Sequence, residues 1–152
     1  MIFLFTMRDK VMEVSIKLLF HISVFYALFI HFHGEESAGG GFQAGAILAS
    51  VFFVYQFVFD EEEYLVTKKL SFRLLFAGII AYFGFGLITM LAGGNFLEFE
   101  ILQKFGFSAS SSHKIGIFII EFGVILVVTM GLLQIGYSFK KVFDTAQPNT
   151  DL

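Results

Sequence analysis

One acidic residue inside a long apolar segment is the clearest sign of chemistry in this sequence. Glu121 lies in the apolar run 115–139, seven residues after Lys114 and therefore two helical turns from it on the same face. In a membrane-spanning helix its carboxylate would lie roughly 10 Å below the interface, where it must be protonated, paired or facing a polar cavity. Two roles are open: ion or proton handling, and a structural pair with a basic residue of a partner subunit.

A second set of ionisable residues recurs at a spacing of four. Glu13, Lys17 and His21 share one face of a predicted helix, and His21 lies about 12 Å deeper than Glu13. A carboxylate, an ammonium group and an imidazole in a row could pass protons inward. The alternative is structural: Glu13 pairs with Lys17 at the interface, where the lysine extends toward water, and His21 hydrogen-bonds to a neighbouring helix.

The segment His31-Phe-His33-Gly-Glu35-Glu36 combines two imidazoles with two carboxylates, a composition that could bind a metal ion. A zinc site needs a fixed set of three or four ligands, however, and nothing in the pattern fixes these. Gly39, Gly40 and Gly41 follow next to a predicted helix start and indicate a backbone packed very closely against another element. We therefore expect close packing here, with neither a metal ion nor a cofactor.

Small residues continue from this turn into the next apolar run. Gly41, Gly45 and Ala49 recur at every fourth position, a stripe that is typical of tight helix contacts in membranes. The chain also has 23 phenylalanines, whose side chains must face lipid or other apolar helices. Together these features predict permanent helix partners in a complex.

The composition as a whole requires a membrane. Of 152 residues, 57% are hydrophobic and only 15% are charged, and the mean hydropathy is +0.80. A water-soluble domain of this size would lack a polar surface. The apolar runs are continuous, without the alternation of barrel strands. They predict an all-α integral membrane protein with four transmembrane helices, over residues 13–32, 42–59, 72–92 and 115–139.

These runs form one expected domain, residues 13–140, between an N-terminal segment 1–12 and a C-terminal tail 141–152. Met7 is an alternative start of the chain. The absence of cysteine excludes disulfides, thiolate metal sites and a cysteine nucleophile. A net charge of −3 without a basic block argues against a nucleic-acid partner.

The positions of Lys and Arg predict the orientation, because these residues gather on the cytoplasmic side of membrane proteins. Eight lie near the two termini or between the second and third runs, and two lie on the other side. The eight are Arg8, Lys10, Lys17, Lys68, Lys69, Arg73, Lys140 and Lys141, and the two are Lys104 and Lys114. We therefore expect both termini in the cytoplasm.

Several short motifs together resemble those of a known family. The first consists of His33, Gly39, Gly40, Gly41, Phe42, Ala44 and Gly45, with Ala38 in place of the family's proline. Further matches are Glu61-Glu62, Gly94-Asn95-Phe96-Leu97, Lys114-Ile115-Gly116 and Ile120-Glu121-Phe122-Gly123-Val124, where the family usually has aspartate instead of glutamate. In these motifs the sequence resembles the MnhB domain, the subunit-B family of multisubunit Mrp-type cation/proton antiporters.

This resemblance covers about residues 13–140 and implies a four-helix accessory subunit of a large membrane complex. The family's larger partner subunits are similar to the proton-pumping subunits of respiratory complex I. The same domain also occurs in antiporter modules of some membrane-bound hydrogenases and related complexes.

We therefore expect an accessory subunit of an Mrp-type Na⁺/H⁺ antiporter in the cytoplasmic (inner) membrane of a prokaryote, without enzymatic activity of its own. Its expected partners are the other antiporter subunits, membrane lipid, Na⁺ and H⁺. The candidate ion or proton residues are Glu121, Lys114, Lys17, His21 and Glu13. The alternative is a purely structural subunit of such a module in a hydrogenase or related respiratory complex. A stand-alone carrier is disfavoured, because the sequence has no internal repeat.

Overall fold

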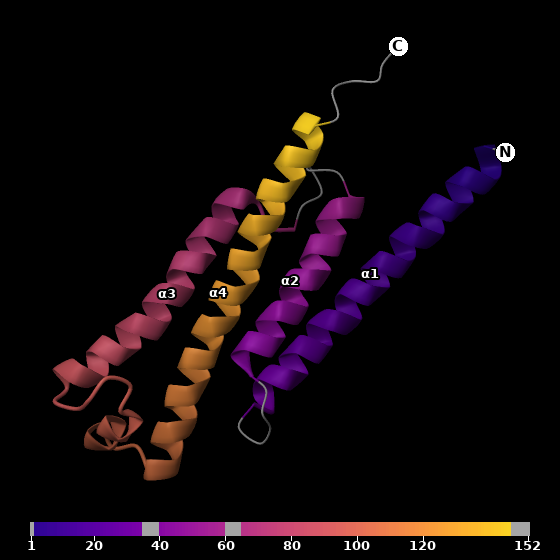
Figure 1. Cartoon of the computed structure of the whole chain (residues 1–152). Coiled ribbons are helices and arrows are strands. Elements are labelled where there is room, and N and C mark those ends of the chain that lie inside the picture. The colour runs from indigo at the N-terminus through magenta and orange to yellow at the C-terminus, as the bar shows by residue number, and fades with distance from the viewer. Residues whose placement is uncertain (1, 35–39, 60–64, 147–152) are drawn as a thin grey trace.

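The computed structural model describes residues 2–34, 40–59 and 65–146, and every regular element in these ranges is a helix (Figure 1). The long helices are α1 (Ile2–Phe32), α2 (Gly41–Val58), α3 (Lys68–Leu91) and α4 (Ala109–Ala146). A short 3₁₀ helix, η2 (Phe99–Phe105), lies between α3 and α4. The all-α prediction is therefore confirmed.

Two helices extend beyond the apolar runs that predicted them. Helix α1 begins at Ile2 and continues through Arg8-Asp9-Lys10, so residues 2–12 form its first turns. Helix α4 begins at Ala109, where the Ser108 hydroxyl accepts a 3.2 Å hydrogen bond from the Ser111 amide and caps the helix. It continues to Ala146, into the predicted tail. Helices α1 and α4 are therefore both longer than the apolar runs that predicted them.

The four long helices lie side by side in one row, in the order α3, α4, α2, α1 (Figure 1). Helix α4 packs against both α2 and α3, whereas α1 packs chiefly against α2. Large apolar side chains along α1 consequently remain exposed, among them Val14, Leu18, Ile22, Phe25 and Phe29. Along the helix axes, the start of α1 and the end of α4 lie at the same end of the bundle (Figure 1).

Three helical segments are long and apolar enough to cross a membrane: Lys10–Phe32, Lys68–Leu91 and Ala109–Phe139. The apolar segment of α2, Gly41–Gln56, is shorter. The described chain thus has three candidate spans and one shorter apolar helix where the sequence predicts four spans.

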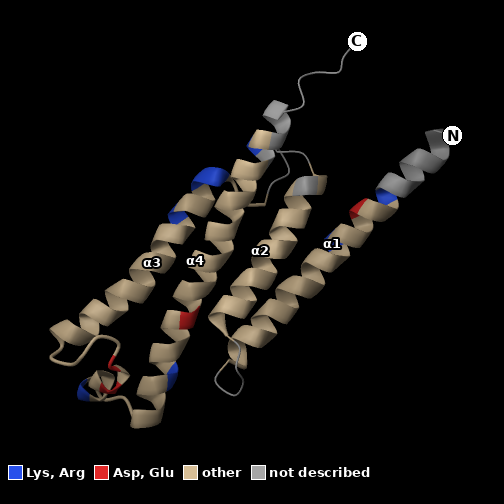
Figure 2. Ribbon diagram, in the orientation of Figure 1, with Lys and Arg blue, Asp and Glu red and all other residues tan. Residues whose placement is uncertain are grey.

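Basic residues gather near the two ends of the bundle along the helix axes (Figure 2). The end with the start of α1 and the end of α4 carries Lys10, Lys68, Lys69, Arg73 and Lys141. The opposite end carries Lys104 and Lys114. The fold therefore keeps the two groups of basic residues apart.

Helix α4 approaches both of its neighbours closely because glycines lie at the contacts. A Cβ on Gly78 of α3 would lie 2.7 Å from the carbonyl oxygen of Gly123, and one on Gly45 of α2 would lie 2.9 Å from the Cβ of Val128. Real Cβ atoms essentially never approach other heavy atoms within 3.0 Å. The glycines of the α2 stripe therefore pack against α4 of the same chain. The tight helix contact predicted for this stripe is thus made with α4 of the same chain, a neighbour that the pattern alone does not identify.

Hydrogen bonds between helices strengthen the same packing. The buried Thr129 hydroxyl of α4 donates to the carbonyl oxygen of Gly45 at 3.1 Å, and the buried Ser71 hydroxyl of α3 donates to that of Met130 at 3.3 Å. Each such bond inside a membrane protein contributes roughly 0.6–2 kcal/mol. Small polar side chains in α3 and α4 therefore hold the helices together.

The connection from α3 to α4 is ordered around Thr89, whose buried hydroxyl hydrogen-bonds to the backbone on both sides of the turn. Two aromatic rings fix it further. The ring of Phe96 occupies the space that a Cβ on Gly86 would need, and the ring of Phe99 does the same at Gly116. This connection therefore packs against both α3 and α4, an arrangement that the sequence did not reveal.

The α2–α4 contact can be tested by Gly45→Leu. Leucine has no room against Val128, so overpacking should destabilise the subunit by about 1–3 kcal/mol and lower the melting temperature of the solubilised complex. Gly84→Leu in α3 is the matched control, because a Cβ there would have only the Ile80 side chain nearby, at 3.8 Å. Equal melting temperatures for the two variants would contradict the contact.

Candidate ion or proton site around Glu121

The carboxylate of Glu121 lies against the turn that joins α1 to α2. A Cβ on Gly34 would lie 2.9 Å from Glu121 Oε1, and one on Gly40 would collide with the same oxygen. A Cβ on Gly41 would collide with the backbone carbonyl oxygen of Glu121. Gly40 also has a φ of 144°, a conformation that side chains disfavour. Glycine is therefore needed at this turn because α4 presents Glu121 directly to its backbone.

His31, in the last turn of α1, is an ionisable residue whose side chain lies beside this carboxylate. Its Nδ1 lies 3.6 Å from Glu121 Oε2, and its side chain is only 3% exposed, against 20% for Glu121. Both ring nitrogens of His31 lack a hydrogen-bond partner among the described residues. The ring centroids of Phe118 and Phe32 lie 5.1 and 5.3 Å from that of His31. The imidazole is thus enclosed by aromatic rings and close to one carboxylate.

His33 is oriented differently from His31. Its Nδ1 lies 2.9 Å from the carbonyl oxygen of Phe29 on its own helix, and its ring stacks on that of Phe29 at 4.2 Å. The sequence motif emphasised His33, whereas the structure places His31 at Glu121. One signal in the sequence was the spacing of four residues between Ala27 and His31, which puts both on the same face of α1. Both residues are buried.

The remaining motif residues have mixed positions. Gly39 and Ala38 lie outside the described residues, as do Glu35, Glu36, Glu61 and Glu62. Phe42 is exposed, while Ala44 and Ala49 are buried in α2. Among the described residues, no group of three or more His, Asp or Glu side chains is arranged to hold a metal ion.

Glu13 and Lys17 form an ion pair on α1, with both side chains 46% exposed. The Lys17 ammonium group also lies 5.3 Å from the ring centroid of Phe59, at the end of α2. His21 Nδ1 lies 2.6 Å from the Lys17 carbonyl oxygen, so this nitrogen contacts the backbone of its own helix. The structure thus pairs Glu13 with Lys17. Lys114, the other basic candidate, is exposed two turns before Glu121.

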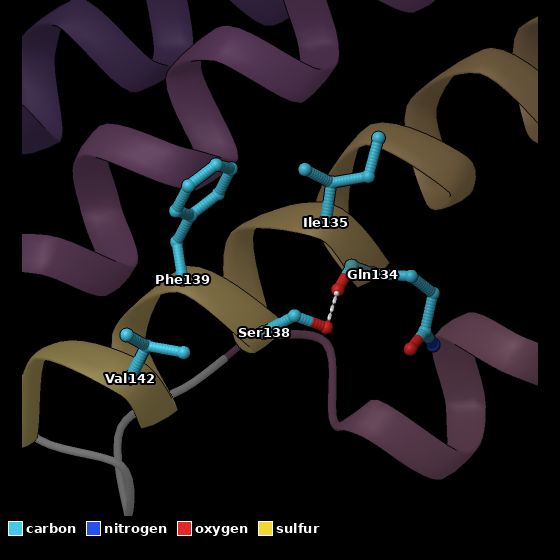
Figure 3. Close-up of a pocket in the computed structure, with 5 residues that line it drawn as sticks. All are labelled: Gln134, Ile135, Ser138, Phe139 and Val142. Carbon is cyan, nitrogen blue, oxygen red and sulfur yellow. Dashed lines mark hydrogen bonds between the residues drawn. The ribbon is translucent and has the colours of Figure 1, made fainter. Parts of the chain in front are cut away.

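A shallow groove on α4, shown in Figure 3, is separate from this site. It has a volume of about 370 Å³ and is lined by Gln134, Ile135, Ser138, Phe139 and Val142. The Ser138 hydroxyl donates to the carbonyl oxygen of Gln134 at 2.9 Å, so that hydroxyl is already used within the helix. Gln134 lies 13 residues, roughly 20 Å, beyond Glu121. The groove therefore adds no group to the candidate site.

Comparison with known proteins gives one family. A family model described as "Domain related to MnhB subunit of Na+/H+ antiporter" matches residues 11–134. Proteins called "Putative antiporter subunit mnhB2" from Staphylococcus aureus strains Newman and JH1 are each 30% identical to this chain over 133 residues. The matched region covers 82% of this chain and 94% of each relative. No solved structure matches this chain.

Proposed function

The chain belongs to the MnhB family of antiporter-subunit domains, and from this premise we propose that it is an accessory membrane subunit of an Mrp-type Na⁺/H⁺ antiporter. In this proposal the other antiporter subunits are its partners and the prokaryotic cytoplasmic membrane is its location. The antiporter assembly, and not this subunit alone, exchanges Na⁺ for H⁺. The subunit supports assembly and contributes one ionisable site to the transport machinery.

The observation that carries this proposal is the position of Glu121. An ionisable side chain within a membrane helix is costly and marks an ion or proton pathway by default. Here α4 directs the carboxylate toward the glycine turn and a buried imidazole, and the side chain remains 20% exposed. A residue that is enclosed yet still accessible suits an exchange of protons or cations better than it suits simple packing.

A structural subunit without a transport role is the competing proposal, and the exposed apolar face of α1 favours it. Such a face needs lipid or another helix to cover it. This role requires no charge at Glu121, so the two proposals predict different behaviour of the same variant.

Glu121→Gln separates them. The amide keeps the size of the side chain and much of its hydrogen bonding but removes the ionisable group. Antiport measured in everted vesicles at matched complex levels should fall by at least about tenfold, as expected for the loss of a proton-transferring group. Glu121→Asp should be much milder because it retains the acid.

Glu100→Gln is the matched control, since Glu100 is an exposed acid of η2 that lies near His113 at 3.5 Å. It should transport at the wild-type rate. A wild-type rate and pH optimum in Glu121→Gln would instead assign Glu121 to a structural role.

The proposed orientation places both termini in the cytoplasm. The chain contains no cysteine, so a single Ser110→Cys substitution at the start of α4 provides a unique label site. A membrane-impermeant maleimide should label it in intact cells, whereas Lys69→Cys at the opposite end should react only after lysis. The reverse pattern would overturn the orientation.

A proton relay through Glu13, Lys17 and His21 is a further proposal for this subunit. If His21 is its inner member, His21→Ala should reduce antiport without reducing the amount of assembled complex. Normal exchange in a fully assembled His21→Ala complex would leave Glu13 and Lys17 as a surface ion pair.

A further inference from the structure

We propose that His31 is the proton partner of Glu121, so that the two side chains form one enclosed proton-exchange pair between α1 and α4. This inference rests on the proposed role of Glu121 in transport and deepens it. The ligand of the pair is a proton, which is held by either the carboxylate or the imidazole.

The geometry places the two groups just short of a hydrogen bond. Nδ1 of His31 and Oε2 of Glu121 are 3.6 Å apart, about 0.4–0.9 Å more than the usual length of such a bond. A side-chain rotation of either residue would be needed to close this gap. Catalytic and proton-transferring contacts are often this long in resting structures and shorten when they act.

The burial of His31 gives the pair its second argument. A buried polar group without a hydrogen bond costs roughly 1–3 kcal/mol, so an imidazole with two such nitrogens needs a reason to be there. Phe32 and Phe118 cover the ring, and neither side chain offers a hydrogen-bonding group. The carboxylate of Glu121 is the nearby acceptor for an imidazole N–H, and protonation of the ring turns this contact into an ion pair.

Helices α2 and α3 place no charged residue beside His31. Helix α2 contains no charged residue. On α3 the charged residues are Lys68, Lys69 and Arg73, near the start of that helix and at the opposite end of the bundle from His31. The nitrogen Nδ1 of His33 contacts its own helix, Glu100 lies near His113, and Lys114 is exposed two turns from Glu121. The contact of His31 with Glu121 therefore joins a histidine and an acid on two different long helices.

The transfer conserves charge within the pair. When protonated Glu121 passes its proton to neutral His31, the O–H bond breaks, an N–H bond forms, and a carboxylate faces an imidazolium. The pair is neutral overall before and after this step, so the transfer moves no net charge into the apolar surroundings. The exposed part of the Glu121 side chain is then the place where a proton enters or leaves.

The test compares His31→Phe and His31→Gln with wild type in the assembled complex. Phenylalanine suits the aromatic surroundings but removes the base, and glutamine retains hydrogen bonding without a titratable group. Without an imidazolium opposite it, Glu121 should keep its proton to higher pH. The acidic limb of the antiport pH profile should therefore move upward by about one unit in both variants.

His113→Phe is the matched control, because His113 lies 3.5 Å from Glu100 but is exposed, and it should leave the profile unmoved. A wild-type profile in His31→Gln would reduce His31 to a packing residue and overturn the inference. If the complex with His31→Phe does not assemble, the antiport pH profile of His31→Gln alone tests the inference.

The two levels of the proposal fail differently. Impaired Glu121→Gln together with an unmoved profile in the His31 variants would keep the transport role of Glu121 and reject its pairing with His31. Unimpaired Glu121→Gln would reject the transport role itself, whatever the His31 variants do.

Discussion

The close approach of α4 to its neighbours is the constraint on which the rest of this structure depends. Between membrane helices there is no hydrophobic driving force, because lipid is as apolar as the side chains, so association relies on close packing and hydrogen bonds. Gly45 and Gly78 allow that packing on two sides of α4, at contacts where a Cβ would not fit. The hydroxyl of Thr129 reaches the α2 backbone only because the two helices are this close.

The same close approach builds the candidate site. Gly41 begins α2 against the backbone of Glu121, and Gly34 and Gly40 leave room for its carboxylate. Larger residues at these positions would force the turn away from α4 and would separate the acid from His31. Packing and chemistry are therefore not independent here: the glycines that let the helices meet also bring an acid and a base from different helices together.

The sequence predicts the helices well but not the contacts between them. Continuous apolar runs reveal the four long helices, and the solitary acid reveals Glu121, because both signals lie within one segment. The helix that covers the Gly41-Gly45 stripe is not encoded locally, and it proved to be α4 of the same chain. The choice of His31 over His33 depends likewise on the rotation of α1 against its neighbours. Two residues of separation turn one imidazole inward and leave the other exposed.

The interior distinguishes structural polar groups from the candidate site. Thr129, Ser71 and Gln134 each donate to a backbone carbonyl of another helix, so their hydrogen bonds are satisfied by packing alone. Among the described residues, the buried side-chain polar atoms without a hydrogen bond are the two ring nitrogens of His31. A purely structural role would be served better by an apolar ring at this position, because the neighbours Phe32 and Phe118 are themselves apolar. The imidazole is therefore best explained by the carboxylate beside it and by the proton that the two groups can share.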